Sequence, residues 1–175
     1  MKKLFLVGLA LIFIIACQQT PQRYFSESPE IETVKSGIKA YENQNWEVWK
    51  SNFADTAKIY PNSSKGITPD ESIEGHKQML SNFSSYGFSE KGGISEMIID
   101  KEGKTWVNYW DHWKGTLKAN GKELHIPVHL TLQFIDGKIA NEYAYYNLAP
   151  YMAALQEIEA EKLAVASEEM NQTEE

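Results

Sequence analysis

Apolar and polar side chains alternate in three consecutive runs, at residues 105–117, 124–135 and 138–147. All three runs are rich in β-branched and aromatic residues, which favour strands. The dipeptides Asn120-Gly121 and Asp136-Gly137 separate them. Both dipeptides favour hairpins, because the tight turn between two strands needs positive φ at its central residues. The pattern therefore predicts a three-stranded antiparallel meander.

The two turns also predict which residues oppose one another across the meander. Centring the hairpins on the two dipeptides places Asp111 opposite Leu130 and Val128 opposite Tyr145. Alternate side chains then form an apolar face and a mixed face, and Asp111 is the one carboxylate on the apolar face. A one-residue bulge would exchange the two faces. Further predicted pairs include Trp113 with Val128, Tyr109 with Leu132, Phe134 with Ile139, Leu132 with Asn141 and Leu130 with Tyr143.

Helix signals precede and follow the meander. Ser28-Pro29 and Thr68-Pro69 have the order of an N-cap followed by proline, and apolar residues then recur at three- and four-residue steps. Trp46 and Trp49 mark a short helix between these two, and helical spacing returns after Pro150. The Ser- and Gly-rich residues 81–93 predict a loop. Three helices in the first half, followed by an antiparallel sheet, predict an α+β fold with the helices on one sheet face.

The amino-terminal residues 1–16 have the pattern of a bacterial signal peptide. Lys2 and Lys3 precede an apolar stretch, at residues 4–16, that is too short to span a bilayer. Its end, followed by Cys17, resembles the bacterial lipobox, in which cleavage precedes a cysteine that carries a diacylglyceryl group. This resemblance predicts a lipoprotein of the cell envelope, with the outer membrane favoured over the inner. An ordinary secretory peptide with an incidental cysteine is the alternative.

Processing would leave a single domain with an acidic surface. Loss of Lys2 and Lys3 would change the formal net charge from −7 to −9, which argues against nucleic acid as a partner. Cys17 is the only cysteine, so no intrachain disulfide forms. We expect a polar tether at residues 17–28, one domain at 29–158 and a frayed acidic tail at 159–175.

Three local stretches, at residues 40–46, 52–59 and 134–139, carry a resemblance to a known family. Together with Tyr143 and Tyr146-Asn147, they resemble the nuclear transport factor 2-like superfamily, in particular its SnoaL-like polyketide cyclase branch. The resemblance implies a cone-shaped curved antiparallel sheet wrapped on the three helices of the N-terminal half, a C-terminal helix and a ligand cavity inside the cone.

The resemblance does not transfer an activity, because the family includes isomerases, cyclases, dehydratases and epoxide hydrolases as well as binding modules. The general base of ketosteroid isomerases would fall on Pro61, and their oxyanion-binding acid on Leu130. The aspartate that often ends the last strand of the cyclase-like branch is Asn147 here. The sequence therefore departs from each of these patterns, and none of these activities transfers to it.

Asp111 is the candidate catalytic residue. Burial disfavours the charged form of a carboxyl group, so an apolar pocket would raise its pKa and allow it to act as an acid or base near neutral pH. The alternative is a structural role, in which Asp111 anchors a hydrogen-bond network. The residues predicted to line the cavity with it and bind a ligand are Tyr60 at the rim, Tyr109, Trp113, Asn141, Tyr143, Tyr145 and Asn147.

Two classes of function remain open. The first is a lipid-anchored module that binds a small, largely apolar molecule; the second is a cofactor-free isomerase, cyclase or hydrolase that uses Asp111. We expect no metal site, since His112, His125 and His129 lie on the mixed face, which suits solvent or a protein interface better. We expect His76, on the third helix, to be a surface residue rather than a ligand. The mixed face also predicts a homodimer. Its expected contact residues are Trp110, His112, His129, Thr131 and Ala144.

Overall fold

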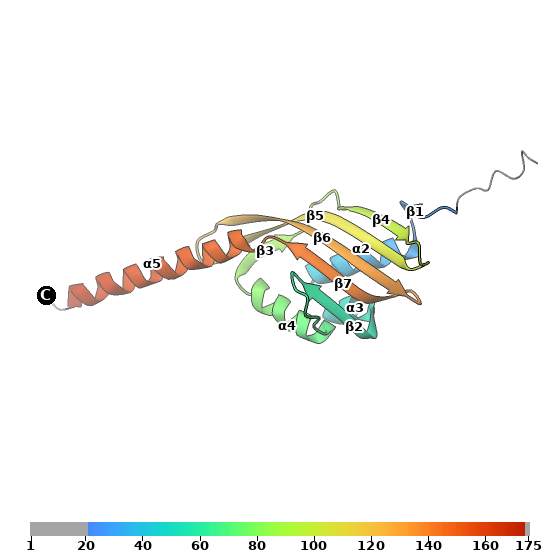
Figure 1. The fold of residues 1–175 in the computed structure, drawn as a ribbon. Coiled ribbons are helices and arrows are strands. Elements are labelled where there is room, and N and C mark those ends of the chain that lie inside the picture. The colour runs from blue at the N-terminus through green and yellow to red at the C-terminus, as the bar shows by residue number, and fades with distance from the viewer. Residues whose placement is uncertain (1–20, 174–175) are drawn as a thin grey trace, which may run out of the picture.

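In a computed structural model, which describes residues 21–173, a curved sheet carries helices on its concave face (Figure 1). The strands are β1 (Tyr24–Phe25), β2 (Phe53–Pro61), β3 (Phe83–Gly87), β4 (Ile94–Ile99), β5 (Thr105–Leu117), β6 (Glu123–Ile135) and β7 (Lys138–Tyr146). The helices are α2 (Pro29–Glu42), α3 (Trp46–Ser51), α4 (Pro69–Leu80) and α5 (Ala149–Thr173). The predicted α+β class and the cone-shaped fold are confirmed.

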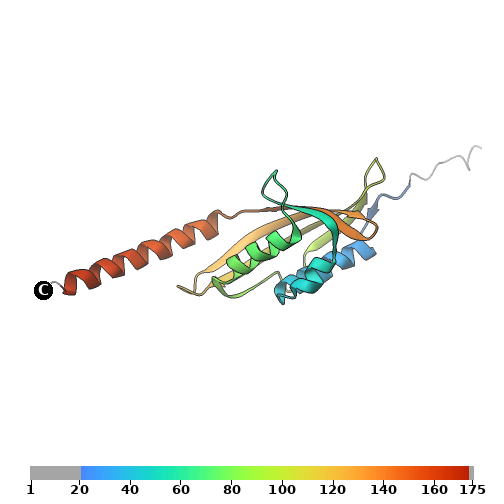
Figure 2. The same cartoon turned by 90° about the horizontal axis from the view of Figure 1, so that it is seen from below.

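The described strands form one seven-stranded sheet in the order β1-β4-β5-β6-β7-β2, and β3 pairs with β5 on the edge that β4 also uses. The sheet is mixed rather than antiparallel throughout, because β2 pairs parallel with β7. The three helices α2, α3 and α4 lie together below its concave face (Figure 2). The core therefore lies between these helices and β5, β6 and β7.

The predicted helix starts are confirmed. The Ser28 hydroxyl accepts a hydrogen bond from the Ile31 backbone N–H at 3.1 Å and begins α2. Thr68 and Glu71 form a capping box at the start of α4. These bonds satisfy backbone donors that the first turn of a helix leaves without partners. The chain after α4 differs from expectation, since residues 83–87 form β3 rather than part of a loop.

The pairing of β5 with β6 differs from the predicted pairing by two residues. Asp111 lies opposite Val128 and Trp113 opposite Ile126. In the connecting loop only Gly121 has positive φ, so the chain does not make the two-residue turn that was assumed. Because side chains alternate with a period of two, this shift leaves every residue of the two strands on its predicted face.

The pairing of β6 with β7 begins as predicted and then changes. Asp136 and Gly137 both have positive φ, and Phe134 lies opposite Ile139. The next pair is Gln133 with Asn141, so Ala140 is an extra residue in β7, which makes a β-bulge. The predicted faces are reversed beyond it. Glu142, Ala144 and Tyr146 lie on the concave face, and Asn141, Tyr143 and Tyr145 lie on the convex face.

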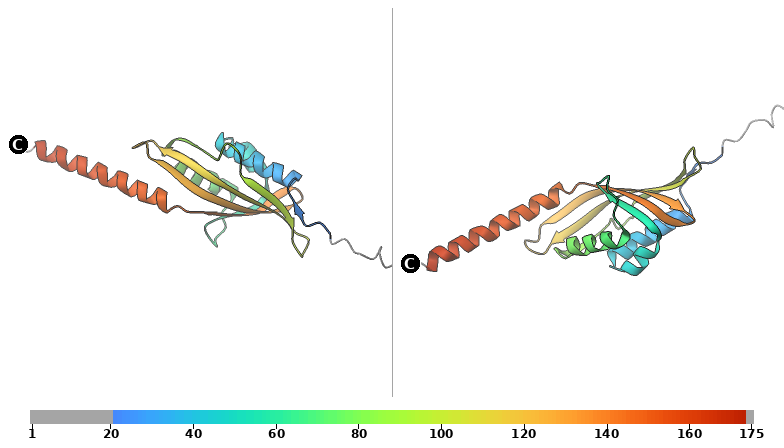
Figure 3. Two further views of the ribbon diagram at one scale, coloured as in Figure 1. Left: turned by 90° about the horizontal axis from the view of Figure 1, so that it is seen from above. Right: turned by 60° about the horizontal axis from the view of Figure 1, so that its bottom comes forward.

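The two ends of the described chain also differ from expectation. Helix α5 does not end near residue 158 but continues to Thr173 and projects from the domain (Figure 3). Only its first part packs on the domain, through the buried side chains of Ala154 and Ile158. Residues 24–25 of the predicted tether pair with β4. The predicted signal peptide and Cys17 lie outside the described residues.

Candidate functional site

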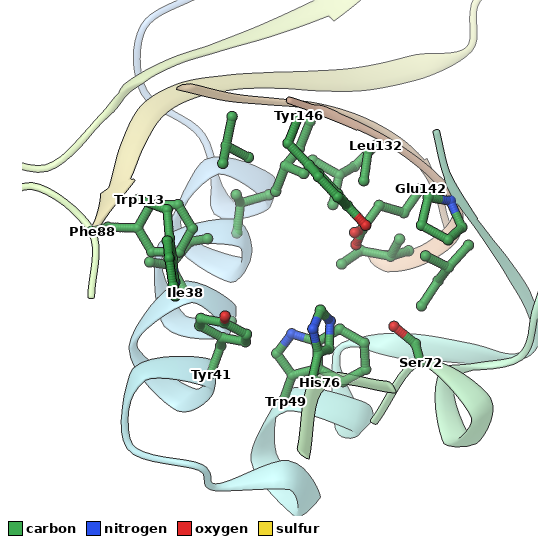
Figure 4. Close-up of a pocket in the computed structure, with 18 of the residues that line it drawn as sticks. Ile38, Tyr41, Trp49, Ser72, His76, Phe88, Trp113, Leu132, Glu142 and Tyr146 are labelled. Atoms are coloured by element: carbon green, nitrogen blue, oxygen red, sulfur yellow. The ribbon is translucent and has the colours of Figure 1, made fainter. Parts of the chain in front are cut away.

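A cavity of about 140 Å³ lies between the helices and the concave face of the sheet (Figure 4). Its wall is mostly apolar and aromatic, and residues from α2, α3, α4, β2, β5, β6 and β7 contribute to it. A void of this size in an apolar core is large enough for a benzene-sized molecule. The main apolar lining residues are Val34, Ile38, Trp49, Phe53, Ile59, Phe88, Trp113, Leu130 and Leu132.

Glu142 is the one acidic residue that lines this cavity. Its side chain is only 9% exposed, between Leu132 on β6 and Ile59 on β2. Within residues 21–173, no hydrogen bond or ion pair reaches its carboxylate. Burial raises the pKa of Glu142 to about 7. The group therefore exchanges a proton near neutral pH, where an exposed glutamate would be fully ionised.

Tyr146 lies on the same face of β7 as Glu142, two residues further along the strand. Figure 4 shows the two side chains pointing toward one another inside the cavity. Burial raises the pKa of Tyr146, and the nearby negative charge of Glu142 raises it further. The Tyr146 hydroxyl therefore stays protonated at neutral pH and can donate to Glu142 or to a ligand.

His76 on α4 faces the cavity from the opposite side (Figure 4). Aromatic rings surround its imidazole, with ring centroids at 5.1 Å for Tyr41, 5.9 Å for Trp49 and 6.1 Å for Trp46. Burial lowers the pKa of His76 to about 4, so the ring is neutral at pH 7. Glu142 and His76 thus have pKa values displaced in opposite directions around one cavity.

One buried donor on the cavity wall, Asn52 Nδ2, has no hydrogen-bond partner within the described residues. The Trp113 indole lies near the Tyr41 hydroxyl and partly offsets the rise that burial causes in the pKa of Tyr41. An unpaired buried donor costs about 1–3 kcal/mol. A ligand or water with an acceptor atom would therefore relieve this cost.

Asp111 is buried on the concave face, as predicted, but it does not line the cavity. One carboxylate oxygen accepts from the Tyr109 hydroxyl at 2.7 Å. The other accepts from the Ser89 hydroxyl at 2.6 Å and from the His112 backbone N–H at 2.7 Å. The nearest ionisable partner is Tyr109, whose pKa burial raises. This geometry favours the structural alternative, in which Asp111 anchors residues 89–93 to β5.

Of the seven predicted ligand-binding residues, Trp113 lines the cavity and six do not. Tyr109 is buried beside Asp111. Tyr60 and Tyr143 stack on the convex face with centroids 4.8 Å apart. Asn147 accepts from the Ala149 N–H at the start of α5. The bulge at Ala140 explains why the side chains of β7 beyond it were predicted on the wrong face. The two remaining convex-face residues are Asn141, which donates to Gln133, and Tyr145, which stacks on His129.

The sequence interpretation missed Glu142 and His76. His76 was predicted to be a surface residue, although it follows Ile73 by three positions and precedes Leu80 by four. That spacing places His76 on the apolar face of α4. The spacing could therefore have identified His76 as an inward-facing residue. Glu142 carries no comparable signal, because its face depends on the bulge.

The comparisons with known proteins identify the fold. No family model and no curated protein matches the chain. The solved structures it resembles include AclR, a proposed hydroxylase from Streptomyces galilaeus, at 12% identity and TM-score 0.59, covering 73% of this chain and 96% of that one. A proposed SnoaL-like polyketide cyclase from Jannaschia sp. CCS1 matches at 14% identity and TM-score 0.59, covering 78% and 95%.

A third neighbour is a protein with a ketosteroid isomerase-like fold from Catenulispora acidiphila, solved in complex with trimethylamine. It matches at 13% identity and TM-score 0.54, covering 67% of this chain and 87% of that one. At such identities the likeness shows the fold. The fold is the nuclear transport factor 2-like fold of SnoaL-like proteins, as the sequence predicted.

Substitution of Glu142 by Gln should remove a pH dependence of stability. Because the folded pKa is about 7 and the ordinary value 4.5, Glu142 stabilises the fold fully below pH 4.5 and loses this contribution as pH rises through 7. The free energy of unfolding of the wild type should therefore fall relative to Glu142→Gln by about 3 kcal/mol between pH 4.5 and 8.

Urea denaturation at several pH values measures this difference. The matched control is Glu96→Gln, which changes an exposed carboxylate on β4. Its free energy of unfolding should change with pH in the same way as that of the wild type. If the free energy of unfolding changed with pH in the same way for the wild type and for Glu142→Gln, the burial of this carboxyl group would be contradicted.

Proposed function

We propose that this protein, with its nuclear transport factor 2-like fold, binds a small, largely apolar molecule in the cavity between its helices and the concave face of its sheet. The observation that carries the proposal is the apolar and aromatic wall around one unpaired carboxyl group, Glu142. Ligand sites commonly combine such a wall with a few polar groups that fix orientation. Trimethylamine, the ligand of the Catenulispora acidiphila neighbour, is small enough for this cavity, and its methyl groups suit the apolar wall.

We also propose that the protein is attached to the membrane of the bacterial cell envelope through lipid on Cys17. The support is the lipobox-like sequence before this only cysteine. Within residues 21–173, no helix is both long enough and apolar enough to cross a membrane. Two or more acyl chains on one cysteine would suffice for stable anchoring.

A second candidate function is cofactor-free proton transfer by an isomerase, cyclase or hydrolase. The observation that favours it is the pair of cavity groups with displaced pKa values, Glu142 at about 7 and His76 at about 4. A base works best when its pKa lies near the operating pH, which suits Glu142. In this reading Glu142 takes the acid–base role for which the sequence suggested Asp111.

Filling the cavity should abolish binding of small apolar probes. Benzene or toluene at 100 times its Kd would stabilise the wild type by about 2.7 kcal/mol, because the probe binds only the folded state. In Ala144→Leu, the added side chain occupies the cavity and the probe should give no increase in Tm.

Differential scanning fluorimetry with each probe measures this effect. Ala160→Leu adds the same atoms at an exposed position of α5, and its Tm increase should equal that of the wild type. Equal increases in wild type and Ala144→Leu would place the binding site elsewhere.

Replacement of Cys17 by Ser should prevent lipid attachment. In cells grown with labelled palmitate, the wild type should carry label and fractionate with membranes, whereas Cys17→Ser should carry none. Immunoprecipitation followed by autoradiography measures the label. Retention of label by Cys17→Ser would rule out this residue as the anchor.

We further propose that two copies pair through the convex face. Trp110 is 39% exposed and stacks on His129 at 4.8 Å, and His129 stacks in turn near Tyr145. Exposed aromatic side chains are common anchors of interfaces. Ala144, one of the predicted contact residues, is instead buried against the cavity.

Trp110→Glu should therefore convert a dimer into a monomer without unfolding it, because it places a charge at the centre of the contact. Light scattering on protein lacking residues 1–17 measures the mass. Thr116→Glu, near the end of the same strand, is the control and should leave the mass unchanged. A monomeric wild type would exclude the pairing.

A further inference from the structure

The cavity lining can carry a negative charge at neutral pH but no positive charge. Its lining residues include no lysine and no arginine, and the ionisable members besides tyrosines are Glu142 and His76. His76 is neutral at pH 7, so the carboxylate of Glu142 is the one charge that the lining can carry there. An anionic ligand would have no opposite charge to meet and would be repelled by Glu142. The wall therefore selects neutral or positively charged ligands.

Aromatic rings surround the space beside this carboxylate. Tyr41, Trp49, Trp113 and Tyr146 all line the cavity, and Figure 4 shows them on different sides of it. The face of an aromatic ring attracts a cation, and desolvation strengthens this attraction. Alkyl groups attached to a cationic nitrogen also pack well against such rings. The wall thus suits an organic cation better than it suits a hydrated inorganic one.

Glu142 makes no ion pair with the protein, although a buried carboxylate without a partner is destabilising. A cationic ligand would supply the missing partner. The unpaired donor Asn52 Nδ2 needs an acceptor, which a hydroxyl or carbonyl oxygen elsewhere on the ligand would supply. The lining thus offers places for one positive charge, several alkyl groups and one acceptor.

From this arrangement, and resting on the proposed binding function, we infer that the ligand is a small organic cation, an alkylammonium whose nitrogen lies against Glu142 and whose alkyl groups lie against the aromatic rings. A cavity of about 140 Å³ limits its size. By comparison with a cavity of about 150 Å³ that accepts benzene, it holds roughly six to eight non-hydrogen atoms.

The test compares choline with 3,3-dimethyl-1-butanol, which has the same shape and hydroxyl group but no charge. Isothermal titration calorimetry at pH 8.5 should show choline binding at least tenfold more tightly than the neutral alcohol. Because Glu142 becomes protonated with a pKa of about 7, choline affinity should fall by about 30-fold at pH 5.5. The alcohol's affinity should change little.

Glu142→Gln should remove both the preference for choline and its pH dependence, whereas Glu96→Gln should keep both. Toluene serves as the folding control, because a folded Glu142→Gln cavity should still take it up. Equal or tighter binding of the alcohol at pH 8.5 would overturn the cation proposal and leave the apolar binding function intact. Failure of choline, the alcohol and toluene together would overturn both.

Discussion

The extra residue at Ala140 determines what lies inside this molecule. A β-strand presents alternate side chains to opposite faces, so one inserted residue moves every later side chain across the sheet. Before the bulge, Ile139 packs into the core. After it, Glu142, Ala144 and Tyr146 enter the cavity and Tyr143 and Tyr145 leave it. Without the bulge, the concave face would carry one more tyrosine, and an amide in place of a carboxyl group.

The cavity that results makes the folded domain less stable than a filled apolar core would make it. It contains a carboxyl group without a partner, a neutral histidine enclosed by rings, and the amide donor of Asn52 without an acceptor. Groups of this kind normally find partners inside a folded domain. Local departures from good packing and pairing tend to occur where a protein binds or transforms something. Their concentration around one space is why we place function there rather than at Asp111, whose oxygens are all paired.

Much of the fold could be predicted from the sequence, because local signals determine it. Ser28 and Thr68 begin helices by satisfying backbone donors, and Asp136-Gly137 makes the tight turn that its residue types allow. The side chains of β5 and β6 were predicted on the correct faces despite the wrong pairing, because the pairing error was an even number of residues. The face of β7 did not, since no glycine or proline marks Ala140 as a bulge. The candidate site depended on that strand and was therefore largely misplaced.

The most direct test of this account is the titration of the Glu142 side chain by carbon-13 nuclear magnetic resonance, with the signal assigned from its absence in Glu142→Gln. Burial in the cavity raises the pKa of Glu142 to about 7, so the titration midpoint should lie near pH 7. A midpoint near the ordinary value of 4.5 would put the carboxyl group in water. That result would contradict both the concave placement of Glu142 and the site built on it.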